Sequence, residues 1–182
     1  MFDENVLPEN AIKVSEAIVT LKDYHNPRGF SHRISNFHDD LYQVKCLMGK
    51  NLGLDSTGTH IAFVGGTAIL IFIDLVAYLI RLNLDLLKPG DDNILDRNSF
   101  KFVLYASVAN PEEVLGKEII EGLKQICKQK GLNNFELIYR FSNQKPPRWD
   151  DAFIERQLQI HSKNAIKRIW VCGPPVMNEV FD

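Results

Sequence analysis

Short apolar runs alternate with longer amphipathic segments along the last two thirds of the chain. Runs of β-branched and aromatic residues between turn residues favour buried strands, whereas apolar positions spaced three or four apart favour helices. Strands and helices are therefore expected in strict alternation over residues 61–65, 69–82, 100–106, 111–130, 134–141, 150–161 and 167–172. This order is typical of an α/β fold with a doubly wound parallel sheet.

The N-terminal part of the sequence has a different pattern. Residues 17–24 and 41–46 alternate apolar and polar positions and predict short strands separated by turns. A polar joint that ends in a glycine, residues 55–58, precedes the first strand of the α/β part. We therefore expect a boundary there, with a short β-rich segment over 1–57 and the α/β domain over 58–182.

The longest apolar run, residues 61–80, is almost long enough to cross a bilayer. Gly65 and Gly66 interrupt this run, and Asp74 places a charge inside it. A buried strand followed by a buried helix explains the same residues. We therefore expect no membrane span.

Composition narrows the classes of function. The hydrophobic content of 45% is enough for a sizeable core, and the formal net charge of −2 gives no general attraction for nucleic acid. A small-molecule ligand is more compatible with this near-neutral charge than nucleic acid is. The three cysteines are widely spaced and lack the pairs that a metal site or a disulfide framework needs, which favours an intracellular, reducing compartment and no metal.

A glycine-containing turn, Gly65-Gly66-Thr67-Ala68, joins the first predicted strand to the first predicted helix. Glycines let a phosphate approach the backbone, and the free N–H groups of a helix N-terminus can hold a pyrophosphate. The Thr67 hydroxyl adds a donor, whereas Ala68 adds a methyl group where a third glycine would leave the backbone open. Close packing of the strand against the helix would explain the glycines equally well.

A second turn, Cys172-Gly173-Pro174-Pro175, follows the last predicted strand. Open α/β sheets bind their ligands at this carboxyl edge, so the Cys172 thiol could lie beside a nicotinamide ring. The alternative is a small buried hydrophobic residue, a common role of a free cysteine. Ser142, after the third strand, is placed to meet an adenosine ribose, although a surface turn would look similar. The histidines are expected to be solvated or structural.

These residues resemble the ferredoxin–NADP reductase superfamily, especially its cytochrome b5 reductase, nitrate reductase and NADPH oxidase-like branches. The family's Gly-Gly-Thr-Gly loop is similar to residues 65–68, and its Cys-Gly-Pro-Pro motif is present unchanged at 172–175. Upstream, residues 29–31 resemble the loop that touches the flavin pyrophosphate, and residues 46–52 resemble the linker between the family's two domains.

The resemblance implies a five-stranded NAD(P)-binding domain preceded by a remnant of a flavin-binding barrel. In such proteins, hydride passes from NAD(P)H to FAD. The positions that the resemblance assigns to binding the dinucleotide are Gly65, Gly66, Thr67, Ala68, Ser142, Gly173 and Pro174. It assigns the catalytic position, beside the nicotinamide, to Cys172. It assigns Ser31 to the FAD pyrophosphate.

The sequence also departs from the family. The Arg-x-Tyr-Ser/Thr motif that holds the flavin has no counterpart before Ser31, so FAD binding requires a complete flavin domain from elsewhere. Unpaired strand edges in the remnant would invite a protein partner. The expected function is a flavin-linked NAD(P)H oxidoreductase. The alternatives are a catalytically degenerate subunit with a structural or docking role, and a nucleotide-binding regulatory module. Ser142-Asn143 favours neither NADH nor NADPH.

Overall fold

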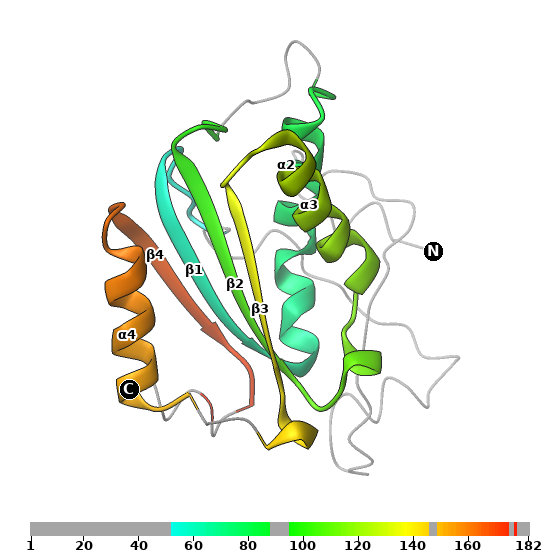
Figure 1. Ribbon diagram of the computed structural model, residues 1–182, viewed down its shortest axis with the longest axis vertical. Helices are drawn as coiled ribbons and strands as arrows, with labels where there is room; N and C mark the ends of the chain where they lie inside the picture. The colour runs from blue at the N-terminus through cyan, green and yellow to red at the C-terminus, as the bar shows by residue number, and fades with distance from the viewer. Residues whose placement is uncertain (1–51, 88–94, 146–148, 175–176, 178–182) are drawn as a thin grey trace, which may run out of the picture. The chain divides into compact units, whose positions relative to one another are not determined.

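The computed structural model describes residues 52–87, 95–145, 149–174 and 177 (Figure 1). The strands expected over 17–24 and 41–46, the flavin-contacting Ser31 and Pro175 of the second turn lie outside these residues. The domain boundary proposed at residue 57 therefore stays a prediction.

Four parallel strands form the sheet of the described part of the chain. They are β1 (Gly58–Gly65), β2 (Phe100–Val108), β3 (Phe135–Phe141) and β4 (Ile166–Cys172), in the order β3-β2-β1-β4. The parallel α/β sheet predicted from the alternating pattern is confirmed. The fifth strand implied by the family resemblance is not among the described residues.

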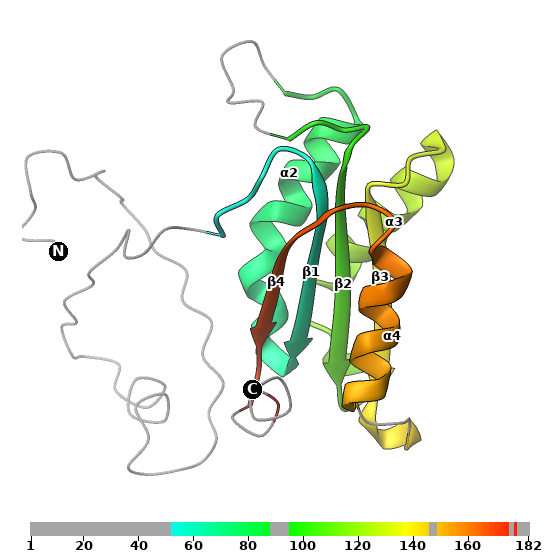
Figure 2. The ribbon, with the colours of Figure 1, turned by 90° about the vertical axis from the view of Figure 1, so that its left-hand side faces the viewer.

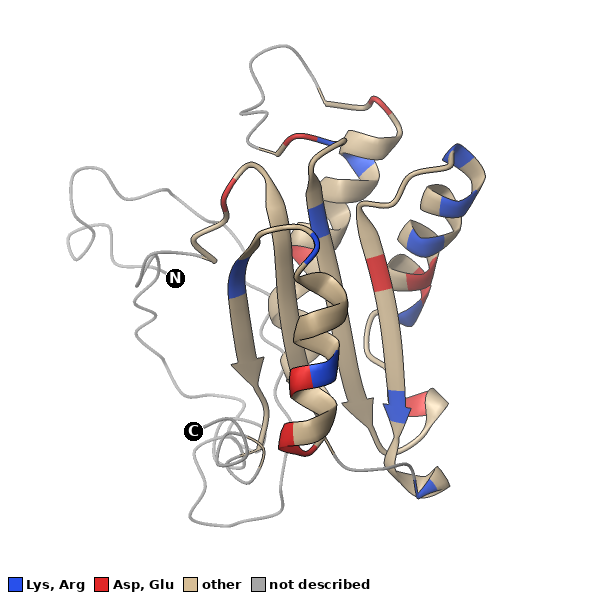
Figure 3. Ribbon diagram, turned by 60° about the vertical axis from the view of Figure 1, so that its left-hand side comes forward, with Lys and Arg blue, Asp and Glu red and all other residues tan. Residues whose placement is uncertain are grey.

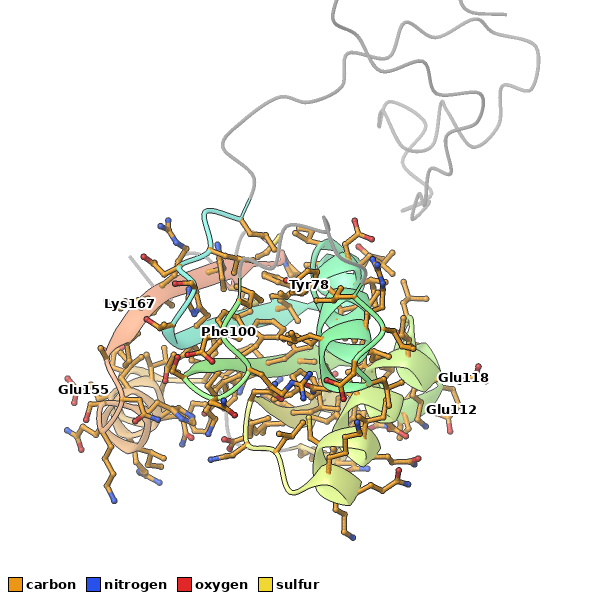
Figure 4. The ribbon with its side chains drawn as sticks, turned by 90° about the horizontal axis from the view of Figure 1, so that it is seen from above. Tyr78, Phe100, Glu112, Glu118, Glu155 and Lys167 are labelled. Atoms are coloured by element: carbon orange, nitrogen blue, oxygen red, sulfur yellow. The ribbon has the colours of Figure 1, made fainter. Side chains whose placement is uncertain are left out.

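Helices cover both faces of this sheet, so the doubly wound arrangement is also confirmed. Helices α2 (Ile73–Asn83) and α3 (Lys117–Lys130) lie on one face and α4 (Asp151–His161) lies on the other (Figures 1 and 2). Seen from above, α4 with Glu155 and α3 with Glu118 lie on opposite sides of the strands (Figure 4).

Alternate residues of the central strands enter two separate core clusters. In β1, Ala62 and Val64 belong to the larger cluster, which also contains buried residues of α2 and α3. Ile61 and Phe63 belong to the smaller cluster, against which Phe153 of α4 packs. Because both faces are covered, the strand sequence is apolar at nearly every position.

The helix predicted over 111–130 is interrupted. Pro111–Glu113 forms a short 3₁₀ helix, capped by the Asn110 side chain, which accepts from the N–H groups of Glu112 and Glu113. Gly116 then adopts a left-handed conformation with φ of 67° immediately before α3. A left-handed residue cannot continue an α-helix, which explains the break. The helix predicted over 69–82 likewise begins as a 3₁₀ helix, Gly66–Phe72, before α2.

The helical stretch Gly66–Asn83 is long and apolar enough to cross a membrane by length and composition, with a mean hydropathy of 1.7. One such helix is weak evidence for a span, because the core helix of a soluble protein has the same properties. In the described structure Leu75, Val76 and Leu79 of this stretch are at most 4% exposed against the sheet. This packing accounts for the apolar character of α2.

Candidate functional site

The order of the strands reverses between β1 and β4. The chain proceeds from β1 outward through β2 to β3, and then crosses to the other side of β1 to form β4. The two strands end together, with Val64 paired to Cys172. In open α/β sheets, ligands bind outside the carboxyl ends of the strands at such a switch point. Both sequence motifs, the turns beginning at Gly65 and at Cys172, therefore lie at this position.

Gly65 and Gly173 pack directly against each other across the switch point. A methyl group built on Gly173 would lie 3.2 Å from the Gly65 nitrogen, and one built on Gly65 would lie 2.9 Å from Cδ of Pro174. Contacts this short leave little room for a side chain at either position. Close packing is thus a sufficient reason for both glycines.

Gly66 has a different reason to be glycine. Its φ of +59° lies in the left-handed region, and a methyl group built on it would meet no atom within 4 Å. Gly65, which precedes the helix as its N-cap, has no side chain to accept from the first-turn N–H groups. The loop at Gly66 therefore combines open space with backbone donors, as an anion requires.

The next two residues of the loop are partly buried. Ala68 packs against the larger core cluster, so its methyl group contributes to the core. The assignment of Thr67 and Ala68 to a pyrophosphate stays a prediction.

Cys172 is the last residue of β4 and is partly buried. Burial raises the pKa of its thiol, so the thiol is protonated at neutral pH. A protonated thiol is a poor nucleophile, and covalent catalysis by Cys172 is disfavoured. The position suits a neutral group beside a ligand.

Ser142 lies at the same edge of the sheet but after β3, two strands away from β1. It is exposed, and its carbonyl accepts from the Lys145 N–H at 3.2 Å. The Asn143 N–H donates to the Ala109 carbonyl at 3.0 Å, which ties the loops after β2 and β3 together. The structure thus brings Gly65 next to residues 173–174 and places Ser142 farther along the edge.

Charges of both signs lie at this edge (Figure 3). Arg140, near the end of β3, donates from Nη1 to the Ser107 hydroxyl at 3.0 Å. Glu112 and Glu113 follow β2 in the short helix that comes after it.

Two histidines are buried with partners, as expected of structural residues. Nε2 of His60 accepts from the Asp55 N–H at 3.1 Å and lies 3.9 Å from its carboxylate. Nε2 of His161 lies 2.9 Å from the Tyr105 hydroxyl. Burial lowers the pKa of both rings. No group of three metal-ligating side chains occurs within the described residues.

Met177 was not predicted from the sequence as part of this site. Its sulfur would lie 2.6 Å from a methyl group built on Gly173 and 3.2 Å from one built on Gly65. The single available signal was its closeness in sequence to the Cys-Gly-Pro turn. An apolar residue there is equally compatible with the core.

No family model matches the sequence, and no curated protein matches it. Among solved structures, the chain is similar to the crystal structure of a histidine-to-lysine mutant of ferredoxin-NADP+ reductase from Plasmodium falciparum in complex with 2'P-AMP. The TM-score is 0.47 and the identity 17%, over 67% of this chain and 46% of that chain. This chain therefore spans less than half of that protein. A similarity at this level assigns no function.

Proposed function

We propose that residues 58–182 form the nucleotide-binding domain of a flavin-linked NAD(P)H oxidoreductase-like protein. The observation that carries the proposal is the position of two turns, at Gly65-Gly66 and Cys172-Gly173, on either side of the switch point of a parallel sheet. Residues distant in sequence meet where such folds bind ligands.

In this proposal, each part of the dinucleotide meets different residues of the site. The open backbone at Gly66 and the first-turn N–H groups would hold the pyrophosphate, and the Thr67 hydroxyl would add a hydrogen bond. Cys172, Gly173 and Pro174 would border the nicotinamide, which supplies the hydride when bound. Ser142 would meet the adenosine ribose. FAD would be held by a complete flavin domain, and Ser31 lies outside the described residues.

Isothermal titration calorimetry with NADH and with NADPH tests nucleotide binding. Replacing Thr67 by valine keeps the shape and removes the hydroxyl, and we expect affinity to fall roughly ten- to hundredfold, because a hydrogen bond to a charged group contributes about 1.5–3 kcal/mol. Thr59→Val is the matched control, since Thr59 lies at the opposite end of β1. It should leave the affinity unchanged.

A visible absorption spectrum of the purified protein tests separately whether this chain itself holds FAD, which the proposal assigns to a complete flavin domain. Bound FAD would show its absorption bands, and adding NADH would bleach them. Absence of both flavin and nucleotide binding would refute the reductase proposal.

One observation favours the second candidate, a degenerate subunit with a structural or docking role. The contact between Gly65 and Gly173 explains both glycines without any ligand. If neither nucleotide binds and Gly65→Ala still destabilises the fold, the motif serves packing, and the structural role is the better account.

A further inference from the structure

The thioether of Met177 fills the space beside the two glycines at the switch point. Methyl groups built on Gly65 and Gly173 would lie 3.2 Å and 2.6 Å from its sulfur. The Met177 N–H donates to the Pro174 carbonyl at 2.8 Å, which holds its backbone next to the end of the Cys172-Gly173-Pro174 segment. One flexible side chain therefore takes up the volume that both missing side chains leave.

Met177 belongs to the side of the sheet that α4 covers. Its side chain packs against the smaller core cluster, which contains Ile61 and Phe63 of β1. Gly65 follows these residues at the next alternate position of the strand, so its missing side chain would point toward the same face. Gly66, by contrast, meets no atom within 4 Å of a built methyl group. One part of the site is filled and the other is open.

We propose that Met177 is a displaceable plug of the nucleotide site. A phosphate can reach the open loop at Gly66 while Met177 stays in place. The nicotinamide end of a dinucleotide, which would border Cys172 and Gly173, requires the volume that the sulfur occupies. Methionine suits this role because its unbranched side chain can change rotamer without backbone movement. The inference rests on the proposed function and specifies how the same site is regulated.

Binding of two ligands, ADP and NADH, can be compared to test the open part and the filled part of the site separately. ADP carries the phosphates and the adenosine but lacks the nicotinamide, whereas NADH carries all of them. Met177→Ala should tighten NADH binding about tenfold, equivalent to 1.4 kcal/mol, and leave ADP binding unchanged. Met177→Leu keeps the bulk in a branched side chain that changes rotamer less readily, so NADH binding should not tighten as it does in Met177→Ala.

Labelling with ¹³C-methyl methionine gives a readout on the unmodified protein, which has three methionines. The Met177 methyl signal, identified by its loss in Met177→Leu, should shift on adding NADH and stay in place on adding ADP. This measurement does not depend on the stability of the alanine variant.

The outcomes distinguish the plug from the proposed function. Two results would contradict the plug while leaving nucleotide binding intact, provided that the unmodified protein binds NADH. In the first, Met177→Ala does not change the affinity for NADH. In the second, it changes the affinities for NADH and ADP equally. A Met177 signal that NADH leaves in place leads to the same conclusion. If neither the unmodified protein nor any variant binds either ligand, the proposed function is wrong, and the role proposed for Met177 is then wrong as well.

Discussion

Asn83 and Asn134 hold each other by two hydrogen bonds between the end of α2 and the start of β3. Nδ2 of Asn134 donates to Oδ1 of Asn83 at 2.7 Å, and Nδ2 of Asn83 donates to Oδ1 of Asn134 at 3.1 Å. Both residues are at most 2% exposed. Cys127 of α3 also donates from its thiol to Oδ1 of Asn134, at 3.2 Å. The pair thus ties two helices to the edge of the sheet.

Replacing Asn134 by alanine should strongly destabilise the fold. The change leaves the Asn83 amide oxygen and the Cys127 thiol without the partner that Asn134 supplies, and Nδ2 of Asn83 keeps only its hydrogen bond to the Cys127 sulfur at 3.4 Å. A buried polar group without a partner costs about 1–3 kcal/mol. We expect the free energy of unfolding, measured by urea denaturation, to fall by roughly 2–3 kcal/mol. The double variant Asn83→Ala/Asn134→Ala should cost less than the sum of the single changes, because the two share one interaction. A loss below about 0.5 kcal/mol in Asn134→Ala would show that the pair is not needed.

Two glycine-to-alanine changes should have opposite effects on stability. In Gly65→Ala the new methyl group meets Pro174 at 2.9 Å, and overpacking of this kind costs about 1–3 kcal/mol. Gly122 lies inside α3 with no atom within 4 Å of a built methyl group, so alanine should stabilise the helix by about 0.5–1 kcal/mol. Thermal unfolding measures both. If both variants changed the unfolding temperature equally, close packing would not explain the glycine at position 65.

Stability should decrease as the pH falls below about 6.5, the ordinary pKa of histidine. Burial lowers the pKa values of His60 and His161 in the folded state. Between the folded and unfolded pKa values the unfolded chain binds more protons, so protonation favours unfolding. The contribution is fully present above pH 6.5 and is lost as the pH falls toward the folded values. Each histidine changes the free energy of unfolding by at most about 1.4 kcal/mol per pH unit.

Urea denaturation between pH 5.5 and 8 measures this dependence, with His161→Gln as the control. Glu136 on β3 raises the pKa of His161 and Lys101 on β2 lowers it, and both are present in the variant. The variant should retain the part of the slope that comes from His60. A stability that is flat over this range would contradict the assignment of two buried, neutral histidines.

The sequence predicted the order of strands and helices because every central strand is buried on both faces. Such strands, for example β1, carry nearly continuous apolar runs that are easy to recognise. The break before α3 was missed, because the left-handed conformation of Gly116 depends on tertiary packing and leaves no periodic signal. A methyl group there would lie 2.6 Å from Ile73 of α2.

The location of the candidate site was also predicted from the sequence, but its internal contacts were not. Motifs at strand ends show where ligands bind once the strands are known to be parallel, so Gly65 and Cys172 could be paired from sequence. The direct packing of Gly173 on Gly65, and the Met177 sulfur against both, depends on how two turns more than a hundred residues apart meet in space. A single sequence contains no pattern that reports such a contact.

Thr59 offers a stabilising change that also serves as the control for nucleotide binding. It is 1% exposed, and its hydroxyl has no hydrogen-bond partner among the described residues. Valine has the same shape and replaces the hydroxyl with a methyl group, which removes the cost of burying an unpaired polar atom. We expect the free energy of unfolding to rise by about 1 kcal/mol in urea denaturation. A fall in stability would mean that the hydroxyl has a partner after all. Because Thr59 lies near the start of β1 and Thr67 follows the end of this strand, a change in nucleotide affinity in Thr67→Val alone would locate the ligand at the carboxyl edge.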